Sequence, residues 1–408
     1  MPGFFDHILS VLFLVLFSYQ IVFIFASLLL KEKQPVHELK YHDLAILICA
    51  RNEENVIADL LESIHAQTYP KEHFHTFVMA DNCNDRTARI AEENGATVYE
   101  RYDPDLVGKG HALEELLYRI GRDYGKAFDA CIVIDADNLL KEDYLEQMNR
   151  SYCEGNRIIA SYISSKNYGQ NWISAGYSLF LLKKDRFLNN ARYLLGLSCA
   201  INGTGFLFDR ELIPEWDYHT LTEDIELSVD QACRHHRIAY CDKAVVYDEQ
   251  PVSLKQSFYQ RIRWAKGYLQ VIGKYTPSLL KGIVEGDFSC YDMLNTILSA
   301  YGLSVISLLT KLITFLTLIC LGRDIVPYTR SILWGLLNAY MVTYLTGLLT
   351  TVVEWNRIDA STSQKILYTF TYPLFLATYL PIAIYALFAK VTWVPIRHGI
   401  RSSHETGC

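Results

Sequence analysis

The chain has 408 residues, of which 50% are hydrophobic and 20% are charged, and its formal net charge is −7. A negative balance gives no support for a nucleic-acid-binding surface, so we expect no nucleic-acid partner. An apolar content this high beside so many charges predicts a polar domain joined to membrane segments. The ten cysteines are scattered without a C-x-x-C pair, which favours reduced core residues over a disulfide framework or a zinc site.

The chain begins with an apolar segment, residues 8–30, that is long enough to cross a bilayer. It lacks a basic n-region and a small-residue cleavage site, so we expect a retained anchor and not a signal peptide. Lys31 and Lys33 follow it and favour the cytoplasmic side for the next domain.

Apolar runs and helical patterns then alternate. We expect strands at 44–50, 74–80, 96–100 and 129–135 and helices at 53–66, 85–94 and 111–121. This alternation predicts an α/β domain built on a parallel sheet, in which ligands bind beyond the carboxyl ends of the strands. The absence of G-x-G-x-x-G and G-x-x-x-x-G-K-[ST] disfavours a dinucleotide oxidoreductase or a P-loop NTPase.

Three polar clusters stand at the carboxyl ends of the predicted strands, at residues 51–54, 81–85 and 135–137. The third contains Asp135 and Asp137, which point to one face because side chains two apart on a strand do so. Their charges repel unless a cation lies between them, and a divalent ion that holds a diphosphate would supply that charge. Taken alone, a D-x-D sequence is more often a solvated acidic turn.

Two further motifs follow. Thr222-Glu223-Asp224 precedes a helical stretch, where it could also be a capping sequence with an acidic first turn. The stretch 260–264, Q-R-I-R-W, mixes aromatic and basic residues shortly before an apolar segment, which suits an amphipathic helix at a bilayer surface.

Three more segments, at 294–321, 331–353 and 366–389, are long and apolar enough to span a bilayer. The last contains Pro373 and Pro381, so it is expected to be kinked or re-entrant. Four crossings would put the C-terminus outside, whereas the basic tail at 390–401 favours the inside, and both orientations stay open. The expected division is an N-terminal anchor (1–40), a cytoplasmic domain (41–250), interfacial amphipathic helices (251–290) and C-terminal transmembrane helices with a tail (291–408).

The ordered motifs resemble those of membrane-integrated glycosyltransferase family 2, which includes the cellulose, chitin, hyaluronan and poly-N-acetylglucosamine synthases. They are R-N-E at 51–53, Asp81, Lys109, D-x-D at 135–137, T-E-D at 222–224 and Q-x-x-R-W at 260–264. The resemblance covers roughly residues 44–267. It implies a GT-A-type nucleotide-sugar-binding domain with a mostly parallel sheet, accompanied by transmembrane helices.

The resemblance also implies roles for individual residues. Asp224 would be the catalytic base, and Asp81 would contact the nucleoside. Asp137, with Asp135, would hold Mg²⁺ or Mn²⁺. The expected nucleotide-sugar-binding residues are Arg51, Glu53, Asp81, Lys109, Asp135 and Arg263. The expected acceptor-side residues are Gln260, Trp264 and Glu223, with the loop at 202–205 beside them.

The implied activity is inverting transfer from a nucleotide sugar, UDP-glucose or UDP-N-acetylglucosamine, to a growing polysaccharide through β-linkages. The protein would be a multi-pass plasma-membrane protein whose catalytic domain is cytoplasmic. Cellulose- and hyaluronan-type synthases thread their product through more membrane helices than four. Export would therefore need a narrow channel, an oligomer or a partner subunit. The alternative is a glycolipid-forming transferase with a membrane lipid acceptor; a catalytically inactive scaffold is a third hypothesis, which the intact Asp137, Asp224 and Arg263 disfavour.

Overall fold

The computed structural model describes residues 4–31 and 39–391. The expectations that rest on Lys33 and on most of the basic tail at 390–401 lie outside the described residues.

One eight-stranded mixed sheet organises the domain, with the strand order β3-β2-β1-β4-β7-β6-β8-β5. The four predicted strands are parallel neighbours: β1 (Leu44–Ala50), β2 (Phe74–Asp81), β3 (Thr97–Arg101) and β4 (Ala130–Asp135). The other half holds β5 (Leu139–Leu140), β6 (Ile158–Ser165), β7 (Phe206–Asp209) and β8 (Ile238–Asp248). There β7 runs antiparallel to β4 and β6, β5 runs antiparallel to β8, and β6 and β8 are parallel. The expected α/β class with a mostly parallel sheet is confirmed.

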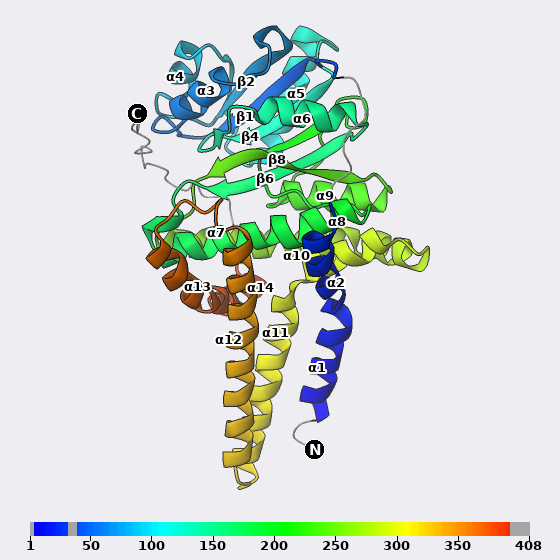
Figure 1. Cartoon of the computed structure of the whole chain (residues 1–408), viewed down its shortest axis with the longest axis vertical. Coiled ribbons are helices and arrows are strands. Elements are labelled where there is room, and N and C mark those ends of the chain that lie inside the picture. Colours follow the sequence, from blue (N-terminus) through cyan, green and yellow to red (C-terminus); the bar gives the residue numbers. More distant parts are fainter. Residues whose placement is uncertain (1–3, 32–38, 392–408) are drawn as a thin grey trace.

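Helices cover both faces of this sheet (Figure 1). Along β1, Ile46 and Ile48 pack against α3 (Ile57–His65), α4 (Thr87–Glu93) and α6 (Tyr144–Cys153) on one face. Ala45 and Leu47 face α5 (Lys109–Tyr124) and α7 (Trp172–Lys184) on the other. Alternation along the strand sends neighbouring side chains to opposite faces, so a strand buried on both faces reads as a continuous apolar run.

Two predicted helices differ at their starts for local reasons. The helix expected from residue 53 begins only at Ile57, because Asn52 adopts a positive φ of 58° and the chain turns before the helix. The helix expected from residue 111 begins at Lys109, directly after Gly108 with its φ of 146°. Lys109 is therefore fixed in a first helical turn, and is not part of a loop.

Below the sheet, α7 and α10 (Leu254–Val284) cross the underside of the domain (Figure 1). The remaining short elements of the domain are η1 (Lys71–His73), η2 (Tyr168–Gln170), η3 (Asp185–Asn189), α8 (Asn190–Leu194) and α9 (Glu223–Cys233). The stretch 260–264 lies within α10, a single amphipathic helix of 31 residues.

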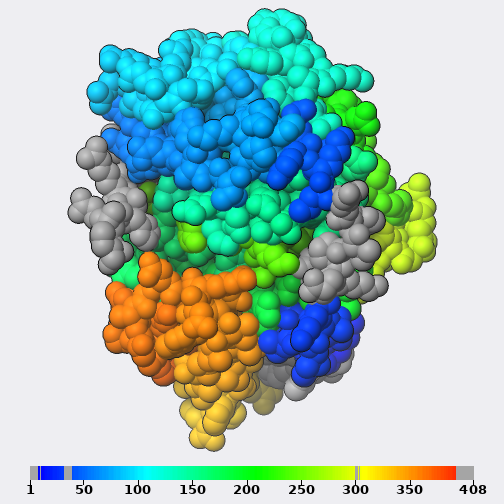
Figure 2. Space-filling view, turned by 45° about the horizontal axis from the view of Figure 1, so that its top comes forward, coloured from blue at the N-terminus to red at the C-terminus, as the bar shows by residue number. Residues whose placement is uncertain are grey.

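The apolar helices lie at or below this underside (Figure 1). They are α1 (Phe4–Phe17), α2 (Tyr19–Leu29), α11 (Phe288–Cys320), α12 (Val326–Val353), α13 (Thr362–Ala377) and α14 (Tyr379–Phe388). In the space-filling view the N-terminal helices (dark blue) and the C-terminal helices (orange) lie on opposite sides of the lower half (Figure 2). Three helical stretches among the described residues are long and apolar enough to cross a membrane: Val11–Leu29, Val326–Val353 and Thr362–Phe388. The last is divided at Thr378, between α13 and α14, in line with the expected kink.

The fourth expected span, at 294–321, lies almost wholly within α11 and stays a prediction. Ser304–Cys320 is an apolar helical stretch inside it. Ahead of this span, the first turns of α11 pack against the domain, where Asp292 is fully buried. Its carboxylate accepts hydrogen bonds from the Arg192 guanidinium on α8 (Nε to Oδ2, 2.6 Å) and from the Tyr19 hydroxyl on α2 (2.7 Å). This buried ion pair joins three elements that are distant in the sequence.

Candidate active site

The carboxyl ends of β1, β2 and β4 meet at one edge of the sheet, above α9 and α10. A cavity of about 2360 Å³ opens there. Every candidate site residue from the sequence lines it: Arg51, Glu53, Asp81, Lys109, Asp135, Asp137, Glu223, Asp224, Gln260, Arg263 and Trp264. The structure thus brings together side chains that are spread over more than 200 positions of the sequence.

Lys109 connects three parts of this cavity. Its ammonium group donates to a carboxylate oxygen of Asp135 and to the carbonyl oxygen of Gly203 (2.8 Å). Although burial disfavours the charged form, the carboxylates of Asp135 and Glu223 raise the pKa of Lys109 above its usual range. Lys109 is therefore a permanent positive charge beside the D-x-D motif.

The loop at 202–205 supports the end of β4. The Thr204 hydroxyl accepts a hydrogen bond from the Asp135 N–H (2.9 Å) and donates one to Asn138 Oδ1 (2.6 Å). Asn138 in turn donates to Asp248 Oδ1 (2.8 Å). Gly203 lies beside the catalytic candidate, because a Cβ placed there would be 3.9 Å from Asp224 Oδ2. The loop therefore fixes the backbone of the D-x-D motif and lies beside Asp224.

Asp81 is held by a partner that the motifs did not identify. Its carboxylate, 5% exposed, accepts a hydrogen bond from Arg101 Nη1 (2.6 Å), and Asp81 and Arg101 are direct neighbours in the β2–β3 register. Arg101 also donates to the carbonyl oxygen of Leu106 (2.8 Å). A parallel pairing of the predicted strands 74–80 and 96–100, extended by one residue, would have indicated the contact.

Glu223 and Asp224 begin α9 with two adjacent carboxyl groups. Burial and the charge of Asp224 raise the pKa of Glu223 to about 7, against the opposing effect of Lys109 and Arg263. Burial also raises the pKa of Asp224. A carboxylate that is partly desolvated and more basic than usual suits a proton acceptor near neutral pH.

A stability prediction follows for Glu223→Gln. The folded chain holds a proton on Glu223 that the unfolded chain releases above pH 4.5, so this group costs stability as pH rises from 4.5 through 7. Replacing the carboxyl group by an amide should raise the free energy of unfolding of the substrate-free protein by roughly 3 kcal/mol at pH 8, and by almost nothing at pH 4. Thermal unfolding at both pH values measures this. Glu215→Gln, at an exposed position, is the control; an equal shift for both variants at pH 8 would contradict the prediction.

Helix α10 supplies the opposite wall of the cavity. Trp264 packs edge-on against Tyr177, with ring centroids 5.8 Å apart and planes at 83°. Arg263 makes no hydrogen bond or ion pair with a described residue, although its charge lowers the pKa of Glu223 and Asp224. The Gln260 side-chain oxygen is buried and has no hydrogen-bond partner among the described residues. These polar groups are therefore available to a ligand in the cavity.

A close approach fixes α10 against α9. A Cβ on Gly267 would lie 2.4 Å from the Thr222 hydroxyl oxygen, so a glycine is required where the two elements touch. Thr222 is the N-cap residue of α9, but its hydroxyl makes no capping bond. The T-E-D and Q-x-x-R-W motifs are consequently positioned against each other by direct packing.

The donor atoms fit a divalent cation. Asp135 and Asp137 offer carboxylate oxygens to the same cavity, and hard oxygen donors are the ligands that Mg²⁺ and Mn²⁺ prefer. Lys109 and Arg263 add positive charge around them, so the site as a whole suits a diphosphate.

The cavity also opens into a groove between apolar helices, where many of the lining side chains are exposed. Its walls there come from α1, α2, α11, α12 and α14, and are mostly aliphatic or aromatic. Examples are Phe13, Leu14, Ile21, Leu308, Leu312, Val342, Leu380 and Ala383. One end of the cavity is thus charged and the other is apolar.

A sheet of this order with a cationic and carboxylate-rich site at its carboxyl edge defines a glycosyltransferase of the GT-A class. The model of the family described as "Glycosyltransferase like family 2" matches residues 42–267, more than half of the chain, and the chain belongs to this family.

Curated relatives share about a quarter of their aligned residues with it. It is 26% identical over 250 residues to "Probable glycosyltransferase YdaM" of Bacillus subtilis, covering 58% of each chain. It is 26% identical over 266 residues to a "Beta-monoglucosyldiacylglycerol synthase" of Nostoc, covering 63% of this chain and 55% of the relative. It is 25% identical over 251 residues to a "Poly-beta-1,6-N-acetyl-D-glucosamine synthase" of Staphylococcus aureus, covering 60% and 58%. The match thus spans less than two thirds of each relative.

Among solved structures, the fold is similar to that of the mannosyltransferase PcManGT from Pyrobaculum calidifontis, solved in complex with GDP-Man and Mn²⁺. The TM-score is 0.59 over 94% of this chain and 99% of that chain, at 13% sequence identity. At this identity the similarity concerns the fold, and it includes most of the helices outside the sheet domain.

Proposed function

We propose that this protein transfers a sugar from a nucleotide sugar, UDP-glucose or UDP-N-acetylglucosamine, to a hydroxyl group of a membrane lipid, with inversion at the anomeric carbon. The observation that supports a lipid acceptor is that the cavity opens from Asp224 toward the apolar helices α11, α12 and α14. A growing polysaccharide needs hydrogen-bonding and stacking groups along its path, whereas an acyl chain needs an aliphatic one.

In this proposal, the donor lies at the charged end. Asp81 contacts the nucleoside, and Lys109 and Arg263 neutralise the diphosphate, for which the planar guanidinium offers two-point contacts. Arg51 and Glu53 complete that wall of the cavity. A divalent cation bound by Asp137 and Asp135 supplies further charge neutralisation of the diphosphate.

The acceptor reacts at the boundary between the charged and apolar ends. Asp224 takes the proton of the attacking hydroxyl, and attack opposite the leaving diphosphate converts an α-linked donor into a β-linked product. Burial keeps Asp224 more basic than an exposed aspartate. Trp264 and Gln260, on the facing wall, hold the acceptor end.

The proposed location is a membrane, with α1–α2, α11, α12 and α13–α14 inserted and the catalytic domain on the cytoplasmic side, the orientation that Lys31 favours. The similarity to a glucosyldiacylglycerol synthase supports a lipid acceptor, and the similarity to a poly-N-acetylglucosamine synthase supports a polymer. The apolar walls of the cavity favour a lipid acceptor over a polymer.

The test uses the full chain in vesicles with and without diacylglycerol, supplied with each radiolabelled UDP-sugar. We expect label in the organic phase only when diacylglycerol is present. Ala383→Trp, which fills the apolar end, should raise the KM for the lipid, while Leu345→Trp, at an exposed position on α12 outside the cavity, should not. Label retained in a water-soluble polymer would overturn the lipid acceptor, and no transfer from either UDP-sugar would overturn the proposed activity.

A further inference from the structure

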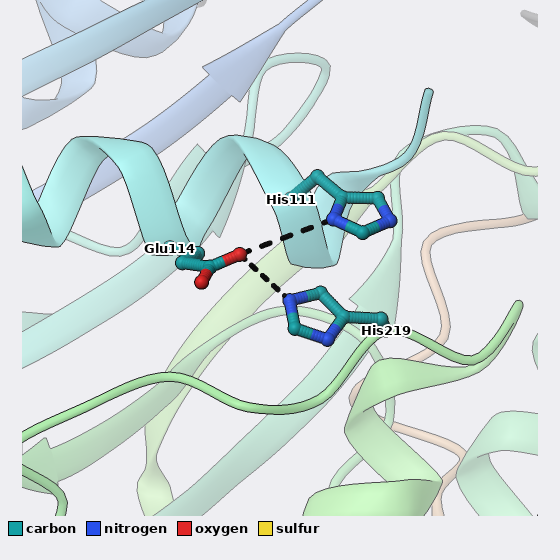
Figure 3. Close-up of side chains that lie close together, drawn as sticks. All are labelled: His111, Glu114 and His219. Carbon is teal, nitrogen blue, oxygen red and sulfur yellow. Dashed lines mark hydrogen bonds and ion pairs between the residues drawn. The ribbon is translucent and has the colours of Figure 1, made fainter. Parts of the chain in front are cut away.

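Three metal-ligating side chains meet outside the cavity. His111 and Glu114 lie one turn apart at the start of α5, and His219 comes from the loop before α9 (Figure 3). The nearer nitrogens of both imidazoles point at one carboxylate oxygen of Glu114, at 2.8 Å from His219 Nε2 and 3.9 Å from His111 Nδ1. All three ligand atoms lie within 4.8 Å of one another.

These separations suit a small divalent cation. Ligand atoms around a tetrahedral zinc ion, bonded at about 2.0 Å, are separated by about 3.3 Å, which lies between the two measured distances. Two imidazoles and one carboxylate are a ligand set that Zn²⁺ favours and that Mg²⁺, with its preference for oxygen, does not. Small rotations of the Glu114 side chain, which is 55% exposed, are enough to equalise the distances.

The two imidazole rings lie face to face beside Glu114. Their centroids are 4.3 Å apart and their planes are at 18°, so both rings present a nitrogen to the same carboxylate from neighbouring positions. The other ring nitrogen of His219 lies 3.6 Å from the Asp217 carboxylate, the kind of outer partner that orients metal-ligating histidines.

The cluster joins two elements of the active site. Helix α5 begins with Lys109, and the loop that carries His219 leads into Thr222 and α9. The two backbones already touch here, because a Cβ on Gly110 would lie 2.1 Å from the carbonyl oxygen of Tyr218. A cation held by both elements would fix Lys109 relative to the T-E-D motif.

We propose that His111, Glu114 and His219 form a second divalent-cation site, selective for Zn²⁺ and similar first-row metals and separate from Asp135 and Asp137. It has three protein ligands, leaves the remaining coordination positions to water, and fastens the loop before α9 to α5.

The test uses the full-length protein, stripped of metal with a chelator and titrated with Co²⁺ in excess Mg²⁺, which occupies the carboxylate site. We expect a visible absorption band of tetrahedral Co²⁺ that one equivalent of Zn²⁺ displaces. His219→Ala and Glu114→Gln should each weaken Co²⁺ affinity by ~10- to 100-fold or more. Losses of this size already follow when a residue that only hydrogen-bonds a metal ligand is replaced. Asp137→Asn should keep the band, and so should His65→Ala, a histidine on α3 outside the cluster.

Metal-free variants that unfold at the temperature of the metal-free wild type would show that folding is intact, and a variant that fails this check is replaced by His219→Gln or Glu114→Ala. The absence of a Co²⁺ band in the wild-type protein would overturn the proposal. An unchanged band in the folded His219 and Glu114 variants would do the same.

Discussion

Replacing Asp224 with asparagine should lower kcat by roughly 10²–10⁴, the usual contribution of a general base, while nucleotide binding stays near normal. Asparagine keeps the size of the side chain and much of its hydrogen bonding, but it accepts no proton. The loss should therefore appear in turnover and not in the Kd for the nucleotide. Single-turnover transfer measures the first, and titration calorimetry with UDP measures the second.

The matched control for this variant is Asp105→Asn, at an exposed position outside the cavity, which should transfer at the wild-type rate. Near-normal turnover in Asp224→Asn would move the base elsewhere. Glu223 would then be the first candidate, because its raised pKa and its place in the cavity satisfy the same chemical requirement.

Removing divalent metal with EDTA should reduce transfer to background, and Mg²⁺ or Mn²⁺ should restore it. Asp135 and Asp137 would otherwise repel the diphosphate, and Lys109 alone balances only one of their two charges. Transfer rates across a titration of each metal into the chelated protein measure this.

The proposed His111–Glu114–His219 site could also lose a cation to EDTA, so His219→Ala is the informative control. Its transfer should remain fully dependent on Mg²⁺ or Mn²⁺, because Asp135 and Asp137 are unchanged. Full activity of the wild-type protein in EDTA would contradict the assignment of a metal to the D-x-D motif.

The half of the sheet whose strands follow one another along the chain, β1 to β4, was predictable. Strands β1 and β4 are almost continuous β-branched or apolar runs, and a parallel sheet brings the carboxyl ends of β1, β2, β3 and β4 to one edge. The antiparallel β7 was not predicted, since its four residues, Phe206–Asp209, carry no periodicity of their own. Its place between β4 and β6 is set by long-range pairing, which a single sequence does not show.

Some residues of the candidate site could also be predicted from the sequence, and others could not. Motif residues such as Lys109 and Asp224 could be found because their spacing resembles a family pattern. Arg101 was missed because its only signal is a register between two strands. The apolar end of the cavity was also missed, because aliphatic residues in α11 and α14 look identical in sequence whether they face lipid, protein or a bound molecule.

In the proposed membrane orientation, the buried Arg192–Asp292 pair would limit how deep the molecule can sit in a bilayer. Charged groups are costly in hydrocarbon, and a pair that is broken there leaves two uncompensated charges. Lipid acyl chains could therefore rise along α11 only to a level below Asp292, which stands in the first turns of that helix. The pair would therefore limit the depth of insertion. It would hold Asp224 at a constant height above the acyl chains, within reach of a lipid headgroup whatever the thickness of the membrane.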